Sequence, residues 1–185
     1  MIIVNITFAS TNHNKFLEVH SILLTHSITV NFSQIPLVEI QSDSLEEIAA
    51  EKAKTAFERV GRQLIVEDDG LFIDSLSGFP GPYSSFVFKT IGNEGILKLL
   101  AGSTRRSAYF RSVIAFYNGI TLSISDGRVC GRISDRVKEV GGWGYDPIFV
   151  PDGTDITFAE LKKSKSEYSH RKRALEKFVQ WYLKL

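Results

Sequence analysis

Residues 64–83 read LIVEDDGLFIDSLSGFPGPY, and the interpretation of the rest of the chain depends on this stretch. It opens with a short apolar run that is typical of a buried strand. Three consecutive carboxylates, Glu67, Asp68 and Asp69, precede a second apolar run and a turn rich in glycine and proline. Adjacent acids between buried segments cost free energy unless a cation or hydrogen-bond donors neutralise them. Two interpretations follow: a polar turn between two strands, or carboxylate ligands for a hard cation such as Mg²⁺.

Length and composition are those of an ordinary globular protein. The 185 residues can form one domain with a sizeable core, so we expect a single domain over residues 1–185. The net charge of +1 gives no basic field, so neither nucleic acid nor a membrane is an expected partner. The single cysteine, Cys130, excludes an internal disulfide and fits a reducing compartment. Without a signal-peptide pattern or an apolar run of membrane-spanning length, a soluble cytoplasmic protein is expected.

The N-terminal part alternates strands and helices. Apolar, β-branched residues 2–9 predict a buried strand, and residues 28–35 predict a second one. Between them, residues 10–15 read STNHNK and precede a helical pattern. Backbone N–H groups at the start of that helix, together with Lys15, would favour a bound anion. The loop contains no glycine and is not a P-loop, and simple helix capping is the alternative.

The clearest helix begins at Ser44, which forms a predicted capping box with Glu47, and ends at Gly61. Lys52 falls within its apolar stripe, and an ammonium group on an inward face needs an anionic partner. Either Lys52 extends its charge to water, or it points towards the acid cluster that follows the helix. Upstream, Glu39 lies in an apolar stretch and is either a functional carboxylate or a simple acid at a strand end.

The middle of the chain is rich in predicted strands. Residues 107–117 predict a long strand, and Asn118-Gly119 is a strong hairpin signal. Two shorter strands are expected over residues 120–126 and 128–133, separated by a turn at Asp126-Gly127. This region has the pattern of an antiparallel meander.

Two later stretches carry candidate binding residues. Residues 141–147 read GGWGYDP, where glycines let the backbone approach a ligand and Trp143 can stack on a base. The alternative is a buried tryptophan that packs against its loop. Residues 162–173 form a basic cluster, which is either a solvated helix start, a reader of an anion or base edge, or a nucleic-acid arm. The neutral overall charge weakens the last interpretation.

Four stretches together resemble the inosine triphosphate pyrophosphatase family, which hydrolyses non-standard purine nucleoside triphosphates. They are STNHNK at residues 10–15, EDDGLFIDSLSGFPGPY at 67–83, GWGYDPIF at 142–149, and TFAEL at 157–161 continuing to SHR at 169–171. Each is weak alone, but the four occur in the right order from the first predicted strand to the last helix. The resemblance implies an α/β fold with an elongated, long mixed β-sheet and flanking helices that form two lobes and a central cleft. It also implies a homodimer and a requirement for Mg²⁺.

The resemblance also implies residue roles. Those implied for the triphosphate are Ser10, Thr11, Asn12, His13, Asn14, Lys15, Lys52 and Asp69. Those implied for Mg²⁺ are Glu39, Glu67 and Asp68, with Asp68 also the general base. Those implied for the purine are Trp143, Gly144, Tyr145, Asp146, Lys165, His170 and Arg171. Two positions depart from the family pattern, since Trp143 stands where Phe is usual and Asp69 where Ser or Thr is common. An ionised Asp69 would repel phosphate unless it binds metal, so either it turns away, or it joins the metal site, or the phosphate grip is altered.

The implied reaction is Mg²⁺-dependent hydrolysis of ITP, dITP and XTP to the monophosphate and pyrophosphate. Asp68 would orient or deprotonate a water that attacks the α-phosphorus, while lysines neutralise the leaving group. Donors from Lys165, His170 and Arg171 would favour a purine 6-oxygen over the amino group of adenine. The alternatives are a related house-cleaning pyrophosphatase for other modified nucleotides, or a non-enzymatic nucleotide or RNA binder.

Overall fold

The computed structural model describes residues 4–138 and 141–185. The strands are β1 (Val4–Ala9), β2 (Ile28–Ser33), β3 (Leu64–Ile73), β4 (Pro80–Gly81), β5 (Ser107–Tyr117), β6 (Leu122–Ile133) and β7 (Phe149–Pro151). The α-helices are α1 (His13–Leu24), α2 (Leu45–Val60), α3 (Ser84–Thr90), α4 (Gly92–Leu99), α5 (Phe158–Leu161) and α6 (His170–Tyr182). Short 3₁₀ helices are formed by Asp74–Leu76 and Lys162–Tyr168. Within these residues, no helix is both long and apolar enough to cross a membrane.

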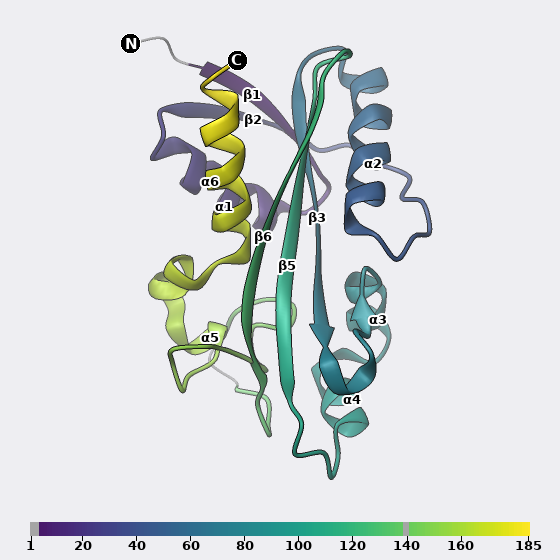
Figure 1. Cartoon of the computed structure of the whole chain (residues 1–185), viewed down its shortest axis with the longest axis vertical. Helices are drawn as coiled ribbons and strands as arrows, with labels where there is room; N and C mark the ends of the chain where they lie inside the picture. Colours follow the sequence, from purple (N-terminus) through teal and green to yellow (C-terminus); the bar gives the residue numbers. More distant parts are fainter. Residues whose placement is uncertain (1–3, 139–140) are drawn as a thin grey trace. The chain divides into compact units, whose positions relative to one another are not determined.

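The sheet is mixed. Its strands follow the order β2-β1-β3-β5-β6-β7, with β4 paired to β3 (Figure 1). β1 pairs in parallel with β2 and β3, whereas β3–β4 and β6–β7 are antiparallel pairs. The predicted α/β class, a mixed sheet with flanking helices, is therefore confirmed. The predicted first and second strands are both present, although residues 2 and 3 of the first lie outside the described part of the chain.

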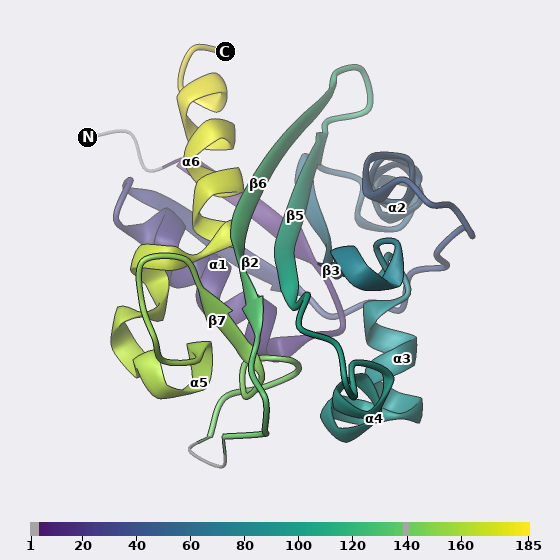
Figure 2. The same ribbon diagram turned by 60° about the horizontal axis from the view of Figure 1, so that its bottom comes forward.

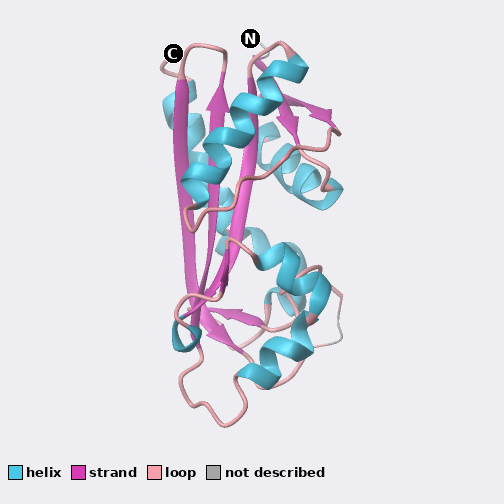
Figure 3. Ribbon diagram, turned by 90° about the vertical axis from the view of Figure 1, so that its right-hand side faces the viewer, coloured by secondary structure: helices cyan, strands magenta, loops and turns pink. Residues whose placement is uncertain are grey.

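The chain forms two compact units. Unit 1 consists of Met1–Asp68, Ser112–Gly127 and Arg171–Leu185, and unit 2 of Asp69–Arg111 and Arg128–His170. The chain passes from one unit to the other within β3, β5 and β6, the long strands drawn in magenta in Figure 3. No linker is needed at these points, which is why the composition shows no boundary.

Unit 1 carries helices on both sides of its strands. α1 and α6 lie on one side and α2 on the other (Figures 1 and 2). On the first side, buried side chains from β1, α1, β5 and α6 form one apolar cluster, which includes Phe8, Leu23, Phe116 and Phe178. Burying an apolar side chain of this size contributes about 1.5–3 kcal/mol relative to leaving it exposed. The cluster holds α1 and α6 against the strands, and both helices carry candidate site residues.

α2 packs closely because its inward stripe contains small residues. The fully buried alanines of this stripe are Ala49, Ala53 and Ala56. Ser44 caps the first turn by accepting a hydrogen bond from the backbone N–H of Glu47 at 3.2 Å, and Gly61 ends the helix at φ 67°. The second half of the predicted capping box is wrong, because the carboxylate of Glu47 accepts from the hydroxyl of Ser42 at 2.7 Å.

β3 is one continuous strand of ten residues. The predicted alternative of a polar turn between two strands is therefore wrong, since Glu67, Asp68 and Asp69 all lie inside the strand. The glycine that follows them lets β4 approach, because a Cβ at Gly70 would lie 2.3 Å from the carbonyl oxygen of Gly81. The three acids are thus fixed in regular backbone.

β6 is also continuous, so the predicted turn at Asp126-Gly127 is wrong. Gly127 is buried within the strand, and buried and exposed residues alternate from there to Ile133. Such alternation is the signature of a strand with one buried face. The hairpin signal at Asn118-Gly119 was interpreted correctly, since these residues follow directly on β5 and precede β6.

Unit 2 has its own apolar core, which is rich in aromatic rings. Phe110 packs edge-to-face against Phe149, with ring centroids 4.8 Å apart, and stacks on Phe158 at 5.8 Å. Leu71 of β3 and Ile96 of α4 belong to the same buried cluster. β7 and α5 lie next to one another and carry two of these rings (Figure 2). This core supports the glycine-rich loop and the residues that precede α6.

Candidate active site

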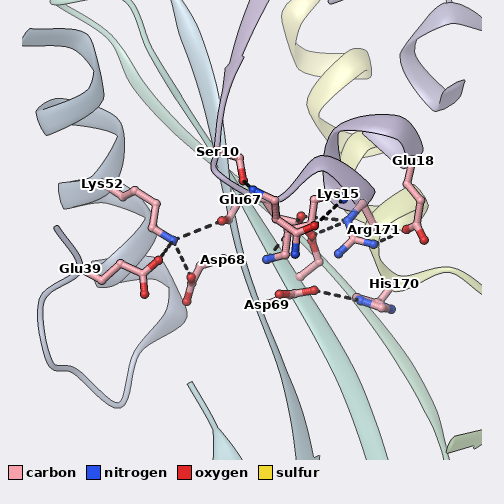
Figure 4. Close-up of polar contacts among 12 residues, drawn as sticks. Ser10, Lys15, Glu18, Glu39, Lys52, Glu67, Asp68, Asp69, His170 and Arg171 are labelled. Atoms are coloured by element: carbon pink, nitrogen blue, oxygen red, sulfur yellow. Dashed lines mark hydrogen bonds and ion pairs between the residues drawn. The ribbon is translucent and has the colours of Figure 1, made fainter. Parts of the chain in front are cut away.

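Unit 1 contains a cluster of acids and cations together with one serine. We call it the acid–lysine cluster. Its members are Lys15, Glu18, Glu39, Lys52, Glu67, Asp68, Ser112 and Arg171. They come from α1, the segment before α2, α2 itself, β3, β5 and the start of α6. The cluster therefore gathers side chains that are far apart in the sequence, and Figure 4 shows most of them around the middle of β3.

The polar loop after β1 is shaped by its own side chains. The hydroxyl of Ser10 accepts from the N–H of Asn12 at 3.1 Å, and Asn12 Oδ1 accepts from the N–H of Lys15 at 3.1 Å. The predicted capping role is thus confirmed at Asn12, the N-cap of α1. The first turn of α1 contains no acidic residue, so the positive end of the helix dipole is not neutralised there. Capping and anion binding are therefore compatible in this loop.

Lys52 projects inward from α2. Its side chain is only 7% exposed, and its Nζ lies 2.6 Å from Glu39 Oε1 and 2.8 Å from Asp68 Oδ1 (Figure 4). The ammonium group also donates to the carbonyl oxygen of Glu67 at 3.4 Å. Of the two predicted alternatives, the inward orientation is confirmed, and extension of the charge to water is wrong.

Asp68 is a buried carboxylate with a displaced pKa. Burial raises the pKa of its carboxyl above the ordinary value, and the charges of Lys52 and Lys15 oppose this effect without cancelling it. A raised pKa brings a carboxylate closer to the proton affinity that a general base needs at neutral pH. The charges of the two lysines lower this pKa and so favour the ionised form that a general base needs.

Glu67 has different surroundings from those of Asp68. Its side chain is fully enclosed, and Arg171 Nε donates to both of its carboxylate oxygens at 2.8 Å. The hydroxyl of Ser112 donates to Glu67 Oε1 at 2.6 Å. Arg171 is itself fully buried and also pairs with Glu18. The structure therefore encloses Arg171 between two carboxylates of unit 1, although the resemblance implied a base-edge role for it.

Of the three residues implied for Mg²⁺, only Glu39 and Asp68 are placed so that they could hold a cation. Among the residues that the structure describes, no group of three or more Asp, Glu, His or Cys side chains is arranged to hold a metal ion. Glu39 and Asp68 both contact Lys52 Nζ, so their oxygens lie close together. Mg²⁺ usually takes one or two carboxylates and completes its shell with water and phosphate oxygens, so this pair fits it. Glu67 does not fit, because Arg171 and Ser112 already use its oxygens.

A second group of candidate residues lies in unit 2, which we call the tryptophan-loop cluster: Trp143, Gly144, Tyr145, Asp146 and Lys165. Asp146 is buried and accepts from Lys165 Nζ at 2.8 Å and from the N–H of Trp143 at 3.3 Å. Lys165 Nζ lies 5.1 Å from the centroid of the Trp143 ring. Burial raises the pKa of the Tyr145 hydroxyl, which donates to the carbonyl oxygen of Ser84 at 2.9 Å. An ammonium group is thus held beside a half-buried indole.

Gly142 makes the loop geometry possible. Its φ is +87°, a conformation that L-residues with a side chain rarely adopt, and a Cβ there would lie 2.9 Å from the Cβ of Asp146. The same Cβ would lie 3.0 Å from that of Ala159. The glycine therefore brings the Trp143 loop into close contact with α5.

Asp69 and His170 lie together in unit 2. Asp69 Oδ2 is 3.7 Å from His170 Nε2 (Figure 4), and the buried imidazole stacks on Phe110 with centroids 4.7 Å apart. Adjacent strand residues point to opposite faces, so the side chains of Asp68 and Asp69 leave β3 on opposite faces. Asp69 therefore has an imidazole beside it, and the options that the sequence leaves open for this residue stay predictions.

A model of the Ham1 family matches residues 6–181. The chain belongs to the Ham1 family. It is 49% identical over 180 residues to the dITP/XTP pyrophosphatase of Methanopyrus kandleri, covering 96% of this chain and 95% of that protein. Identity to the dITP/XTP pyrophosphatase of Saccharolobus solfataricus is 44% over 179 residues, covering 96% and 93%. The resemblance found in the sequence is therefore confirmed over nearly the full length of the chain.

Solved structures of Ham1 relatives agree with this fold. A HAM1 protein from Coxiella burnetii superposes with a TM-score of 0.85 at 29% identity, covering 98% of this chain and 100% of that one. A nucleoside-triphosphatase / dITP/XTP pyrophosphatase from Mycobacterium abscessus gives a TM-score of 0.74 at 30% identity, covering 95% and 98%. The fold of this Ham1 protein is thus shared with relatives of moderate sequence similarity.

Sequence reasoning missed two members of the acid–lysine cluster. Ser112 lies inside a long apolar strand, and Glu18 lies on α1 three residues after Lys15. Neither position belongs to a motif that the sequence analysis singled out. A sequence signal lies at the start of β5, since the period of two places Ser112 on the same face as Ala108 and Phe110, which are apolar.

Proposed function

We propose that this Ham1-family protein hydrolyses non-standard purine nucleoside triphosphates, namely dITP, ITP and XTP, to the nucleoside monophosphate and pyrophosphate. One observation carries the proposal: Lys52 holds two carboxylates, Glu39 and Asp68, at one buried point of unit 1. The naming of relatives with 40–49% identity as dITP/XTP pyrophosphatases supports the substrate class. We propose that the protein acts on free nucleotides in the cytoplasm.

Asp68 is the proposed general base. Its carboxylate takes a proton from a water molecule, and the water oxygen forms a bond to the α-phosphorus. The bond between that phosphorus and the bridging oxygen breaks, and pyrophosphate leaves with the bonding electron pair. Lys15, Lys52 and the N-terminus of α1 stabilise the negative charge on the phosphates. Burial of Asp68 supports this role, because it raises the pKa of the carboxyl.

Glu39 and Asp68 are the residues that we propose to hold Mg²⁺. When bound, the ion would neutralise phosphate oxygens and so lower the cost of forming the charged transition state. Glu39 is 58% exposed as a side chain, so it can adjust to a ligand without opening a packed core.

The tryptophan-loop cluster is the proposed base-binding site. Trp143 stacks on the purine, and stacking on an aromatic ring tolerates different bases. Lys165, held by Asp146, donates to the purine 6-oxygen. Adenine presents an amino donor at that position, so two donors would oppose one another and the wrong base would be rejected. His170 is proposed to read the base edge as well, with Asp69 beside its ring.

We also propose that the protein forms a homodimer. A short stretch of unit 2 exposes several large apolar side chains, and a second copy of the chain would remove them from water. They are Phe79, Tyr83, Phe86 and Ile91, each at least 39% exposed. Size-exclusion chromatography with light scattering tests this proposal. Phe86→Ser, at the most exposed of these positions, should shift the protein towards the monomer.

A substrate panel tests the activity. Hydrolysis of ITP, XTP, dITP, GTP, ATP and a modified UTP should be followed with Mg²⁺, with quantification of pyrophosphate and orthophosphate. We expect the first three substrates to be preferred and pyrophosphate to be the product. Preference for the modified UTP would instead favour a related house-cleaning pyrophosphatase. Salt-sensitive RNA binding without pyrophosphate release would indicate a nucleic-acid binder.

A further inference from the structure

Glu67 carries the most enclosed carboxylate of the acid–lysine cluster. Its side chain has no exposed surface, and one oxygen accepts from both Ser112 and Arg171. The second oxygen accepts from Arg171 as well. A buried carboxylate is costly unless charged and polar donors compensate it, and here they do. The result is an anion whose position is fixed from two sides.

The two donors come from elements that are themselves fixed. Ser112 lies in the buried part of β5, and its side chain is fully enclosed. Arg171 lies in the first turn of α6, where it also pairs with Glu18 of α1. Closed hydrogen-bond networks of this type hold their members in one arrangement. Glu67 is therefore held by a strand and two helices of unit 1.

Lys15 is the cation of α1 that lies beside this anion. Its Nζ lies 3.8 Å from Glu67 Oε2, and its side chain is 14% exposed. At that distance the attraction is chiefly Coulombic, and it is strengthened because the surroundings contain little water. Lys15 is also fixed through its backbone, since its N–H is bonded to the side chain of Asn12. The Lys15 ammonium thus faces a carboxylate that other elements hold by hydrogen bonds.

We infer that Glu67 is an internal counter-ion that sets the position of Lys15, and that Ser112 and Arg171 are positioning residues that act through it. The inference rests on one part of the proposed function, namely that Lys15 binds the triphosphate, and not on its hydrolysis. It replaces the metal-binding role implied for Glu67 and the base-reading role implied for Arg171. Ser112 acquires a role that no sequence motif suggested.

Ser112→Ala is the sharpest test, because it removes one hydroxyl and leaves the buried volume nearly unchanged. Ser125→Ala is the matched control, since it deletes another buried hydroxyl of unit 1, in β6. Tripolyphosphate is the probe, because it presents the phosphates without a base. Titration calorimetry should show about 3- to 10-fold weaker tripolyphosphate binding for Ser112→Ala, because only part of the free energy of the lost hydrogen bond to Glu67 reaches Lys15. The control should bind like the wild type.

A purely structural role of Ser112 would leave a different signature. It would lower the melting temperature of the variant without changing tripolyphosphate affinity at a temperature where the protein is folded. Steady-state kinetics with ITP should show a raised KM, with kcat changed by less than about threefold. Unchanged tripolyphosphate affinity in Ser112→Ala would overturn the inference.

Glu67→Gln separates the counter-ion role from the metal role. Mn²⁺ binding, measured by electron paramagnetic resonance without nucleotide, should be the same in this variant and in the wild type. A loss of Mn²⁺ binding with unchanged tripolyphosphate binding would overturn the inference. Wild-type protein that binds tripolyphosphate but does not hydrolyse ITP would refute the proposed function and leave the inference standing. Wild-type protein that binds no tripolyphosphate would refute the inference.

Discussion

The ammonium nitrogen of Lys52 lies 2.8 Å from a carboxylate oxygen of Asp68, and both side chains are buried. Burial alone favours the neutral form of the Asp68 carboxyl and raises its pKa. The facing charge of Lys52 lowers the pKa of Asp68 and so opposes the effect of burial, although it does not cancel it. The pairing therefore couples the protonation state of the proposed base to a residue on α2.

Replacing Lys52 with methionine should reduce kcat/KM for ITP by about 100-fold, because one cation that stabilises the transition state is lost. The acid limb of the pH profile should also move to higher pH. A neighbouring cation lowers the pKa of Asp68, so its removal raises that pKa further, and the base is active only when ionised. The pH dependence of kcat/KM measures the shift.

Lys54→Met is the matched control for that change. Lys54 lies on the same helix, is exposed and pairs with Glu51 on the surface. Its removal should leave the pH dependence of kcat/KM unchanged. If the acid limb of the kcat/KM profile does not move in Lys52→Met, then Lys52 does not influence the pKa of Asp68.

Trp143→Ala should weaken ITP binding but leave tripolyphosphate binding unchanged. Stacking of a base on an aromatic ring is worth about 1–3 kcal/mol, and tripolyphosphate has no base. Trp143→Phe keeps an aromatic ring and should retain most of the affinity. Equal losses for ITP and tripolyphosphate in Trp143→Ala would show that the loop has only a structural role.

Lys165→Ala should lower the ratio of kcat/KM for ITP to kcat/KM for ATP by about 10-fold, because the donor to the purine 6-oxygen is lost. Asp146→Asn should lower it as well, since the buried carboxylate accepts from Lys165 Nζ. The measurement is the ratio of kcat/KM for the two nucleotides. An unchanged ratio in both variants would mean that the base edge is read elsewhere.

The raised pKa of Tyr145 predicts how the free energy of unfolding changes at alkaline pH. Burial raises the pKa of its hydroxyl in the folded state, whereas an unfolded tyrosine titrates near its ordinary value of about 10. The folded state thus holds this proton more tightly, so the stability contributed by Tyr145 is present below pH 10 and is lost as the pH rises above it.

Tyr145→Phe should therefore lose less stability than the wild type between pH 9 and pH 11. At pH 8 it should be less stable by about 1 kcal/mol, since the hydrogen bond to Ser84 is gone. Urea denaturation at several pH values measures both effects. Parallel stability curves for the two proteins would contradict this prediction.

Local patterns sufficed for much of the fold. The bounds of β5 matched the prediction because its apolar residues and hairpin signal are contiguous. α2 was recognised from its cap, its stripe and its terminal glycine, and the inward position of Lys52 followed from helical spacing. These features are encoded within one element and need no tertiary contact.

The errors have tertiary causes. The continuity of β3 through Glu67 and Asp68 depends on cations supplied by other elements. Arg171, for example, is 104 positions away from Glu67 in the sequence. A single sequence gives no sign of such pairing, so a turn was a reasonable alternative. The sequence also does not reveal that the chain passes from one unit to the other inside strands, because the composition does not change there.

The sequence predicts which residues belong to the site better than it predicts which of them contact one another. Lys15, Lys52 and Asp68 are brought together as expected, and Lys165 lies beside Trp143. The enclosure of Arg171 was not predictable, because a basic residue at a helix start is usually solvated. Burial of its guanidinium requires Glu18 and Glu67 at positions that only the folded chain defines.

Hydrolysis of ITP in water enriched in ¹⁸O tests the central claim most directly. Attack by a water activated by Asp68 on the α-phosphorus predicts that the label enters inosine monophosphate and that pyrophosphate remains unlabelled. Asp68→Asn should abolish the reaction while retaining the fold. Label in pyrophosphate, or release of orthophosphate and inosine diphosphate, would contradict the account.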